Sequence, residues 1–101
     1  MRSLKICYKT KKLKKICERY DEAVKKYGEE MAEKIHLCID SILAAPNINI
    51  LLRFKIHKCH PLRGDRQGQY AMYLAHPYRL VFIPKDDDTV TVRIEEIIDY
   101  H

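Results

Sequence analysis

The chain has 101 residues, and 19 lysines and arginines against 14 acidic residues give it a formal charge of +5. A chain of this length forms a single domain, over residues 1–101, that is too small to enclose a large substrate. Its 47% apolar content, few glycines and prolines, and lack of a long apolar run exclude disordered, fibrous and membrane-spanning classes.

The first predicted elements are a strand and a short helix. Leu4, Ile6 and Tyr8 alternate with Lys5 and Cys7, and this period of two predicts a strand over residues 4–8. Thr10 stands where it can cap a helix whose apolar residues recur every three or four positions, from Leu13 to Tyr20.

The longest periodic segment spans residues 20–43 and is stopped by Pro46, which predicts helical structure over more than twenty residues. Asp21 is the expected N-cap of this segment, and Glu22 then favours its first turn. Gly28 costs a helix about 1 kcal/mol relative to alanine, so the helix can break there. Two helices packed as a hairpin are the simplest arrangement.

The second half of the chain predicts a sheet. Residues 47–58 fit either a short helix or an irregular strand, and both remain open. Residues 70–75, 79–83 and 90–94 alternate as strands do, and the run 95–98 breaks the alternation where a bulge can lie. Strands without intervening helices favour antiparallel pairing. The predicted class is therefore α+β, with an N-terminal helical hairpin packed on a small twisted antiparallel sheet.

The cysteines and the N-terminus point to a cytoplasmic protein. Four cysteines stand ten, twenty-one and twenty-one residues apart, without the short spacing of a metal site. The first residues lack the apolar core of a signal peptide. We therefore expect reduced core cysteines, a cytoplasmic location, no membrane association, and neither a metal nor another cofactor.

The charge alternates along the chain. Residues 1–20, 21–45, 46–84 and 85–101 carry net charges of +7, −3, +5 and −4. If the two basic blocks meet on one face, they form a footprint for a phosphate backbone. The candidate RNA-binding residues of the first block, which also suit an ordinary solvated helix face, are Lys11, Lys12, Lys14 and Lys15.

A polar, turn-rich loop over residues 59–70 concentrates groups that suit chemistry on a phosphate. His60 begins it, Gly64 and Gly68 permit tight turns, and Arg63 and Arg66 offer forked guanidinium donors to phosphate oxygens. The end of the chain supplies a second set of candidates, which are Asp99, Tyr100 and His101. In a regular strand, Tyr100 lies on one face and Asp99 and His101 lie on the other, unless a bulge intervenes.

Metal-independent RNA cleavage needs groups of these kinds. A base removes the proton of the 2′-hydroxyl, an acid protonates the departing 5′-oxygen, and a cation stabilises the charge on phosphorus. Histidine titrates near neutral pH and suits either proton-transfer role. The chain offers His60, His101 and Asp99, with one or more of Arg63, Arg66 and Arg79. Each of them, taken alone, also has an ordinary structural explanation.

Three segments together resemble a known family. Residues 60–70 (HPLRGDRQGQY), 76–82 (HPYRLVF) and 98–101 (IDYH) resemble the HigB-type toxins of the bacterial RelE/ParE superfamily. The resemblance implies a ribosome-dependent mRNA endonuclease that is the toxin of a toxin–antitoxin pair. It also implies a helix-turn-helix, HigA-like antitoxin as the protein partner and mRNA on the ribosome as the substrate.

The same resemblance assigns roles to residues. It implies His60 as a catalytic acid or base, Arg79 as a contact to the scissile phosphate, and Asp99, Tyr100 and His101 as the rest of the active site. Arg63 stands where HigB-type sequences commonly carry lysine, which keeps the charge but replaces a point cation with a planar fork. Arg66 is a phosphate-binding candidate by its charge and its place in the loop.

Two other functions remain open at this stage. The superfamily includes toxins that poison DNA gyrase without cutting RNA, and a degenerate nucleic-acid-binding module can share the scaffold. The terminal Asp-Tyr-His favours the nuclease. The sequence leaves open which of His60 and His101 is the base and which sequence or codon is preferred.

Overall fold

The computed structural model describes residues 3–85 and 88–100. Its elements, in chain order, are β1 (Lys5–Tyr8), α1 (Lys11–Glu18), α2 (Tyr20–Tyr27), α3 (Glu29–Ala44), α4 (Ile48–Arg53), the 3-10 turn η1 (Ile56–Lys58), β2 (His60–Pro61), the 3-10 turn η2 (Gly64–Arg66), β3 (Tyr70–Tyr73), β4 (Tyr78–Lys85) and β5 (Asp88–Asp99).

The starts of the first two helices follow from local chemistry. Thr10 caps α1 as predicted, because its hydroxyl oxygen accepts a hydrogen bond of 3.1 Å from the amide of Leu13. The predicted N-cap at Asp21 is wrong. Arg19 is the only residue between α1 and α2, so the chain turns there and α2 already begins at Tyr20. The Asp21 carboxylate lies in the first turn of α2, 3.2 Å from the Arg19 guanidinium.

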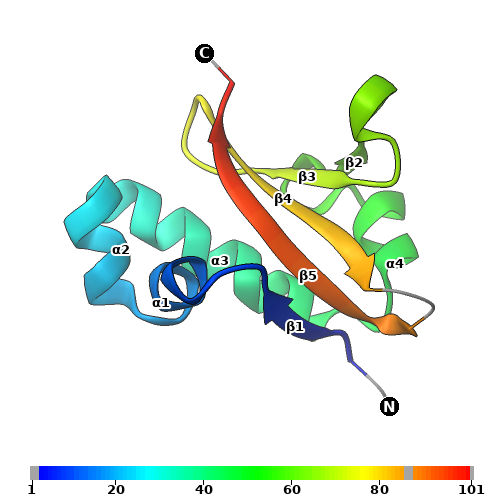
Figure 1. Cartoon of the computed structure of the whole chain (residues 1–101), viewed down its shortest axis with the longest axis horizontal. Helices are drawn as coiled ribbons and strands as arrows, with labels where there is room; N and C mark the ends of the chain where they lie inside the picture. Colours follow the sequence, from blue (N-terminus) through cyan, green and yellow to red (C-terminus); the bar gives the residue numbers. More distant parts are fainter. Residues whose placement is uncertain (1–2, 86–87, 101) are drawn as a thin grey trace.

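The long periodic segment is two helices. Gly28 separates α2 from α3 with φ 90° and ψ 171°, a backbone conformation that is essentially restricted to glycine. The predicted break at Gly28 is therefore confirmed. α2 and α3 fold back on each other as a hairpin, and α1 adds a third helix to the N-terminal layer, where two were predicted (Figure 1).

Residues 47–58, for which the sequence allowed either a short helix or an irregular strand, contain the helix α4 and the 3-10 turn η1. Asn47 caps α4, since its side-chain oxygen accepts a hydrogen bond of 3.1 Å from the amide of Ile50. After α4, Lys55, His57 and Lys58 adopt positive φ angles of 47°, 47° and 56°. These left-handed residues turn the chain from the helix layer towards the edge of the sheet, where η1 packs against β3.

The five strands form one sheet in the order β1-β5-β4-β3-β2. The predicted α+β class is confirmed, with one difference: β1 pairs with β5 in parallel, so the sheet is mixed, while β2 to β5 pair antiparallel. No hairpin connects β1 to its partner, because almost the whole chain lies between them. A tight hairpin would force antiparallel pairing, but the long connection between β1 and β5 allows either direction.

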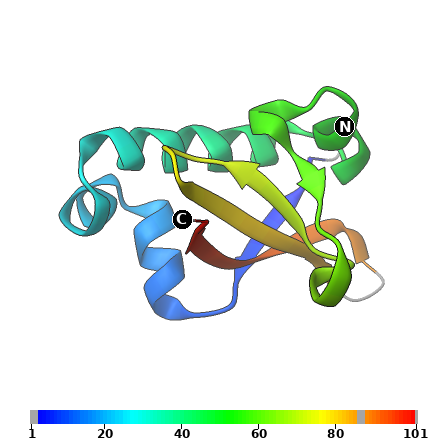
Figure 2. The same cartoon turned by 90° about the horizontal axis from the view of Figure 1, so that it is seen from above.

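The helices cover one face of the sheet, and the core lies between the two layers. Figure 2 shows α3 running along one side of the sheet. Met72, Leu80 and Phe82 are fully buried from the strands, as are Ile35 and Ile42 from α3. The four cysteines are free, and three of them belong to the buried core: Cys17, Cys38 and Cys59. Over the described stretches of chain, no helix combines the length and the apolar character that crossing a membrane requires.

Candidate active site

The face of the sheet that the helices leave uncovered, here called the open face, carries most of the polar candidates. Strand register places residues in rows across this face, because directly paired residues point to the same side. The first row consists of His60, Ala71, Val81 and Glu96. The second row consists of Tyr73, Arg79 and Ile98. Ala71 and Val81 are buried but lie outside the core cluster that the helices share.

His60 is held in a definite orientation on β2. Its Nδ1 lies 2.8 Å from the carbonyl oxygen of Lys58. A carbonyl oxygen can only accept a hydrogen bond, so Nδ1 carries the proton. In the neutral ring, Nε2 then holds a free electron pair and can accept a proton. The left-handed backbone at Lys58 precedes this contact, and sequence reasoning that left residues 47–58 open could not have found it.

Tyr73 is the centre of the site, and sequence analysis did not select it. The guanidinium carbon of Arg79 lies 3.6 Å from the centre of its ring, and the His60 ring meets it edge-on at 6.0 Å. The ammonium of Lys58 lies 5.1 Å from the same ring. The available signal was the alternation of residues 70–75, which places Tyr73 on the face of the strand that points away from the side chain of Met72.

Arg79 is oriented by its neighbours on β3 and β4. Stacking on Tyr73 fixes the plane of the guanidinium, and Nη1 donates a hydrogen bond of 2.9 Å to the carbonyl oxygen of Tyr78. Among the described residues, no carboxylate forms an ion pair with Arg79. The remaining N–H donors of this guanidinium can therefore bind an anion above the open face.

A bulge in β5 brings Tyr100 to this face. Val81 pairs with Glu96 but the next residue, Phe82, pairs with Ile94, so Glu95 is an extra residue in β5 and the predicted bulge is confirmed. Ile94 is part of the core, and without the bulge the positions that follow it by even steps would also face the helices. The bulge moves these positions to the open face, where the centre of the Tyr100 ring lies 5.8 Å from the guanidinium carbon of Arg79.

The other C-terminal candidates do not join this group. Asp99 pairs with Tyr78, whose ring packs against Tyr27 of α2 at 5.3 Å, so register directs Asp99 to the side of the helices. The structure therefore does not bring Asp99 together with His60 and Arg79. His101 lies outside the described residues.

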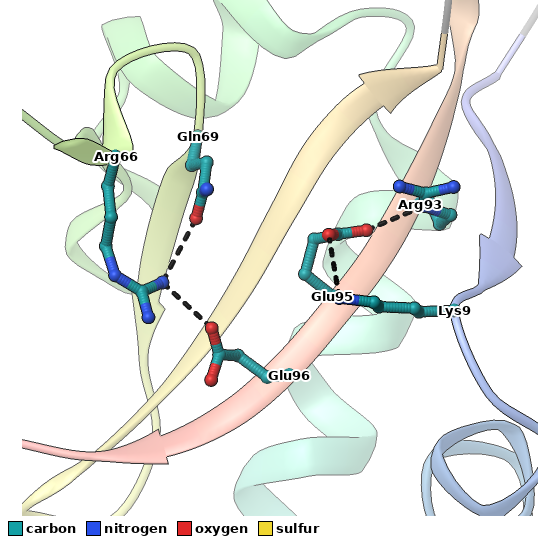
Figure 3. A network of polar contacts seen from close by, with 6 residues as sticks. All are labelled: Lys9, Arg66, Gln69, Arg93, Glu95 and Glu96. Atoms are coloured by element: carbon teal, nitrogen blue, oxygen red, sulfur yellow. Dashed lines mark hydrogen bonds and ion pairs between the residues drawn. The ribbon is translucent and has the colours of Figure 1, made fainter.

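Ion pairs neutralise the part of the open face that β5 contributes (Figure 3). The Arg66 guanidinium donates hydrogen bonds of 2.9 Å to the Glu96 carboxylate and 3.1 Å to the Gln69 side-chain oxygen. The hydrogen bond to Glu96 raises the pKa of Arg66 above its ordinary value. Glu95 lies 2.6 Å from Arg93 and 3.9 Å from Lys9, and these contacts hold the bulged residue in place.

The excess of positive charge therefore lies on η1, on β4 and in the loop that follows β2. Among the described residues, Lys58, Arg63 and Arg79 have no carboxylate partner. Arg63 borders an open cavity of about 570 Å³ formed by residues 61–64, 67–68 and 70. Gly64 and Gly68 give the loop the tight turns predicted for them, with φ angles of 65° and 93°.

The lysines of α1 lie at the other end of the sheet. Lys11, Lys12, Lys14 and Lys15 are exposed, and Lys15 forms an ion pair of 3.6 Å with Glu22. Lys12 borders a groove that Glu95 and Glu96 also line, between α1 and β5. The two basic blocks thus lie at opposite ends of the sheet, with the carboxylates of β5 between them.

Metal ligands are not gathered in this part of the molecule. Across residues 3–85 and 88–100, no three histidine, cysteine or acidic side chains are placed to hold a metal ion. The chemistry that the open face offers is proton transfer by His60 and anion binding by Arg79, beside the phenol of Tyr100.

Solved structures share this fold. The YoeB/ParE toxin from Agrobacterium tumefaciens superposes with a TM-score of 0.65 at 16% identity, covering 97% of this chain and 100% of that one. The YoeB-YefM complex from Staphylococcus aureus gives a TM-score of 0.64 at 21% identity, covering 97% of both chains. The chain has a YoeB/RelE-type toxin fold.

A third match extends the same conclusion. The toxin–antitoxin complex RelBE2 from Mycobacterium tuberculosis gives a TM-score of 0.50 at 15% identity, covering 96% of this chain and 98% of that one. No protein-family model matches the sequence, and no curated protein matches it at a significant level. At these identities, the YoeB/RelE-type likeness is one of fold.

Proposed function

We propose that this chain is the toxin of a toxin–antitoxin pair and cleaves mRNA on the ribosome. The observation that carries the proposal is the contact of His60 and Arg79 with one tyrosine ring on a sheet face that no helix covers. The likeness to YoeB and RelE toxin structures supports the toxin role. The HigB-type assignment within that fold rests on the motifs at residues 60–70, 76–82 and 98–101.

The arrangement suggests how the reaction proceeds. Nε2 of neutral His60 takes the proton of a 2′-hydroxyl, and the 2′-oxygen attacks the adjacent phosphorus. The bond from phosphorus to the 5′-oxygen breaks, leaving a 2′,3′-cyclic phosphate, and the departing oxygen takes a proton from an acid. Arg79 binds the non-bridging oxygens and stabilises the added negative charge. No metal ion or other cofactor takes part.

The acid comes from the C-terminus in this proposal. Tyr100 lies on the open face beside Arg79, and His101 follows it directly in the chain. With His60 proposed as the base through Nε2 of its neutral ring, a second group must donate the proton to the departing oxygen. Asp99, on the other side of the strand, would orient the end of the chain rather than touch RNA.

An exposed site on a small domain explains why the ribosome is required. The open face binds anions but does not surround a strand, so the protein by itself cannot hold a flexible RNA in the geometry for attack. The ribosome supplies mRNA already extended and positioned. Arg63, Arg66 and the lysines of α1 then contact ribosomal or messenger RNA phosphates on either side of the site.

The direct test combines purified chain with ribosomes that carry a defined mRNA and maps the new 5′ ends. His60→Ala should slow cleavage about 10²- to 10⁴-fold through loss of the base, and Arg79→Ala about 10²- to 10³-fold. His36→Ala is the matched histidine control, because His36 is exposed on α3 and pairs with Asp40. Arg19→Ala supplies the arginine control, because Arg19 is exposed and pairs with Asp21.

Four results would overturn the proposal. Intact mRNA with the parent chain would exclude cleavage, and full activity of His60→Ala would exclude the assigned chemistry. Gyrase–DNA cleavage complexes that accumulate while mRNA stays whole would select the gyrase-poisoning alternative. Growth that is unaffected by expression of the chain alone would indicate a degenerate module.

We also infer an antitoxin partner and a cytoplasmic location. Two of the structures with this fold are complexes of a toxin with its antitoxin. By analogy, a helix-turn-helix, HigA-like protein encoded beside this chain would bind it and prevent cleavage. Co-purification of the two products should abolish cleavage, and a stable complex with full activity would refute the inhibition.

A further inference from the structure

The segment that joins α4 to β2 carries an exposed aromatic ring set among cations. Phe54 is 64% exposed, more than any other large hydrophobic residue described. The guanidinium of Arg53 lies 5.7 Å from the centre of its ring, and Lys55 follows it in the chain. A ring with a guanidinium on one face leaves its other face for a second planar group.

The stretch of sequence around Phe54 carries basic residues and no acidic ones. Residues 46–64 contain no aspartate or glutamate, and the first acidic residue after Asp40 is Asp65. Over the same stretch the chain carries Arg53, Lys55, Lys58 and Arg63. Such a segment attracts a polyanion and repels a basic surface.

The backbone of this segment is held in an uncommon conformation. Lys55, His57 and Lys58 are left-handed, which residues other than glycine adopt rarely and at a cost. His57 is fixed by a hydrogen bond of 3.1 Å between its Nε2 and the hydroxyl of Ser41 on α3. A costly conformation that is tied to the helix layer gives Phe54 and its neighbours a defined position.

The segment leads directly into the candidate active site. Lys58, four residues after Phe54, places its ammonium 5.1 Å from the centre of the Tyr73 ring. Its carbonyl oxygen accepts a hydrogen bond from the N–H at Nδ1 of His60. Four residues span at most about 14 Å of chain, so the backbone at Phe54 lies within that distance of the backbone at Lys58, which contacts the site.

From these contacts we propose that Phe54 stacks against a base of the RNA strand that His60 and Arg79 cleave. Lys55 and Lys58 would follow the phosphates between that base and the scissile bond. The inference rests on the proposed function for the strand that it positions. Its occupant is a single-stranded RNA, because every base offers a flat face to the ring and the adjacent cations match the phosphates.

The test measures binding of an oligonucleotide that cannot be cleaved. A single-stranded RNA with 2′-O-methyl groups and a fluorescent 2-aminopurine base is titrated with the full chain. Phe54→Ala should weaken binding about 5- to 150-fold, the range for loss of one base stack, whereas Phe54→Trp should retain it. Leu37→Ala is the control, because Leu37 is 50% exposed on α3 and lies outside the basic segment.

The outcomes separate this proposal from the proposed function. Equal affinity of Phe54→Ala and the parent overturns the stacking, even if the parent cleaves mRNA. A parent that binds RNA through Phe54 but never cleaves on ribosomes overturns the nuclease and leaves the stacking. Phe54→Ala that binds RNA normally but loses a co-purifying antitoxin shows a protein-binding ring and overturns the proposal. If the parent binds the oligonucleotide too weakly to measure, the variants are compared by kcat/KM on ribosomes, where equal values overturn it.

Discussion

Removing the ring of Tyr73 tests whether the site depends on how Arg79 is held. In the parent, the guanidinium carbon of Arg79 lies 3.6 Å from the centre of this ring, and the His60 ring forms a T-shaped pair with it at 6.0 Å between ring centres. Tyr73→Ala leaves both proposed catalytic side chains, His60 and Arg79, in the protein but removes the surface that orients them. We therefore expect a loss of activity without a change in the ionisable groups that carry it.

The size of the loss follows from two contributions. A cation over an aromatic ring is worth about 0.5–2 kcal/mol, with the higher values for less hydrated pairs. Freed from the ring, Arg79 also regains part of the roughly 2 kcal/mol of rotamer entropy that an arginine can lose. Together they amount to about 1–3 kcal/mol of lost transition-state stabilisation, or about 5- to 150-fold in kcat/KM.

The assay compares kcat/KM for cleavage on ribosomes across a small set of variants. Tyr73→Phe keeps the ring and should stay within about threefold of the parent. Tyr20→Ala removes an exposed tyrosine on α2 and controls for the substitution itself. Thermal unfolding of each variant separates loss of activity from loss of folding.

Combining Tyr73→Ala with Arg79→Ala checks that the ring acts through the guanidinium. The double variant should be little worse than Arg79→Ala, because most of what the ring orients is already absent. Additive losses would refute the reasoning, because the ring would then act independently of Arg79. A Tyr73→Phe variant as impaired as Tyr73→Ala would also refute it and would assign the phenol hydroxyl a role of its own.

Three further predictions concern charge, backbone and thiols. Glu96→Gln should change stability by less than about 1 kcal/mol, since the pair with Arg66 is half-exposed, yet bind RNA more tightly and with a salt slope steeper by about 0.7. Glu33→Gln on α3 is the control. An unchanged salt slope for Glu96→Gln would contradict the idea that the substitution releases Arg66 from its ion pair to bind RNA. Gly28→Ala should lower the free energy of unfolding by about 1–3 kcal/mol in a urea titration, because φ 90° with ψ 171° strains any side chain although there is open space for one; unchanged stability would argue against this conformation. Burial raises the pKa of Cys17, Cys38 and Cys59 from 9.0 to about 12, so thiols of the unfolded chain ionise first and stability should fall as the pH rises from 9 towards 12. Urea unfolding at pH 8 and pH 10.5 measures this, and equal midpoints would be evidence against buried thiols.

Much of the fold was predictable because its signals are local. Helical periodicity, the Thr10 cap, the break at Gly28 and the alternation of β3 and β4 each depend on a few neighbouring residues. The sequence also placed Arg79 in a strand, and the broken alternation at residues 95–98 predicted the bulge. It placed His60 in a polar loop, where the structure has the two-residue strand β2.

The assembly of the site depended on contacts between distant segments, which no local pattern encodes. Register brings Tyr73 of β3 between His60 and Arg79, and the single extra residue Glu95 moves Tyr100 to their face while Asp99 stays on the other. A shift of one position reverses every side chain that follows in a strand, so the residues present could be read from the sequence but their faces could not. The direction of β1 was likewise set only by its packing beside β5.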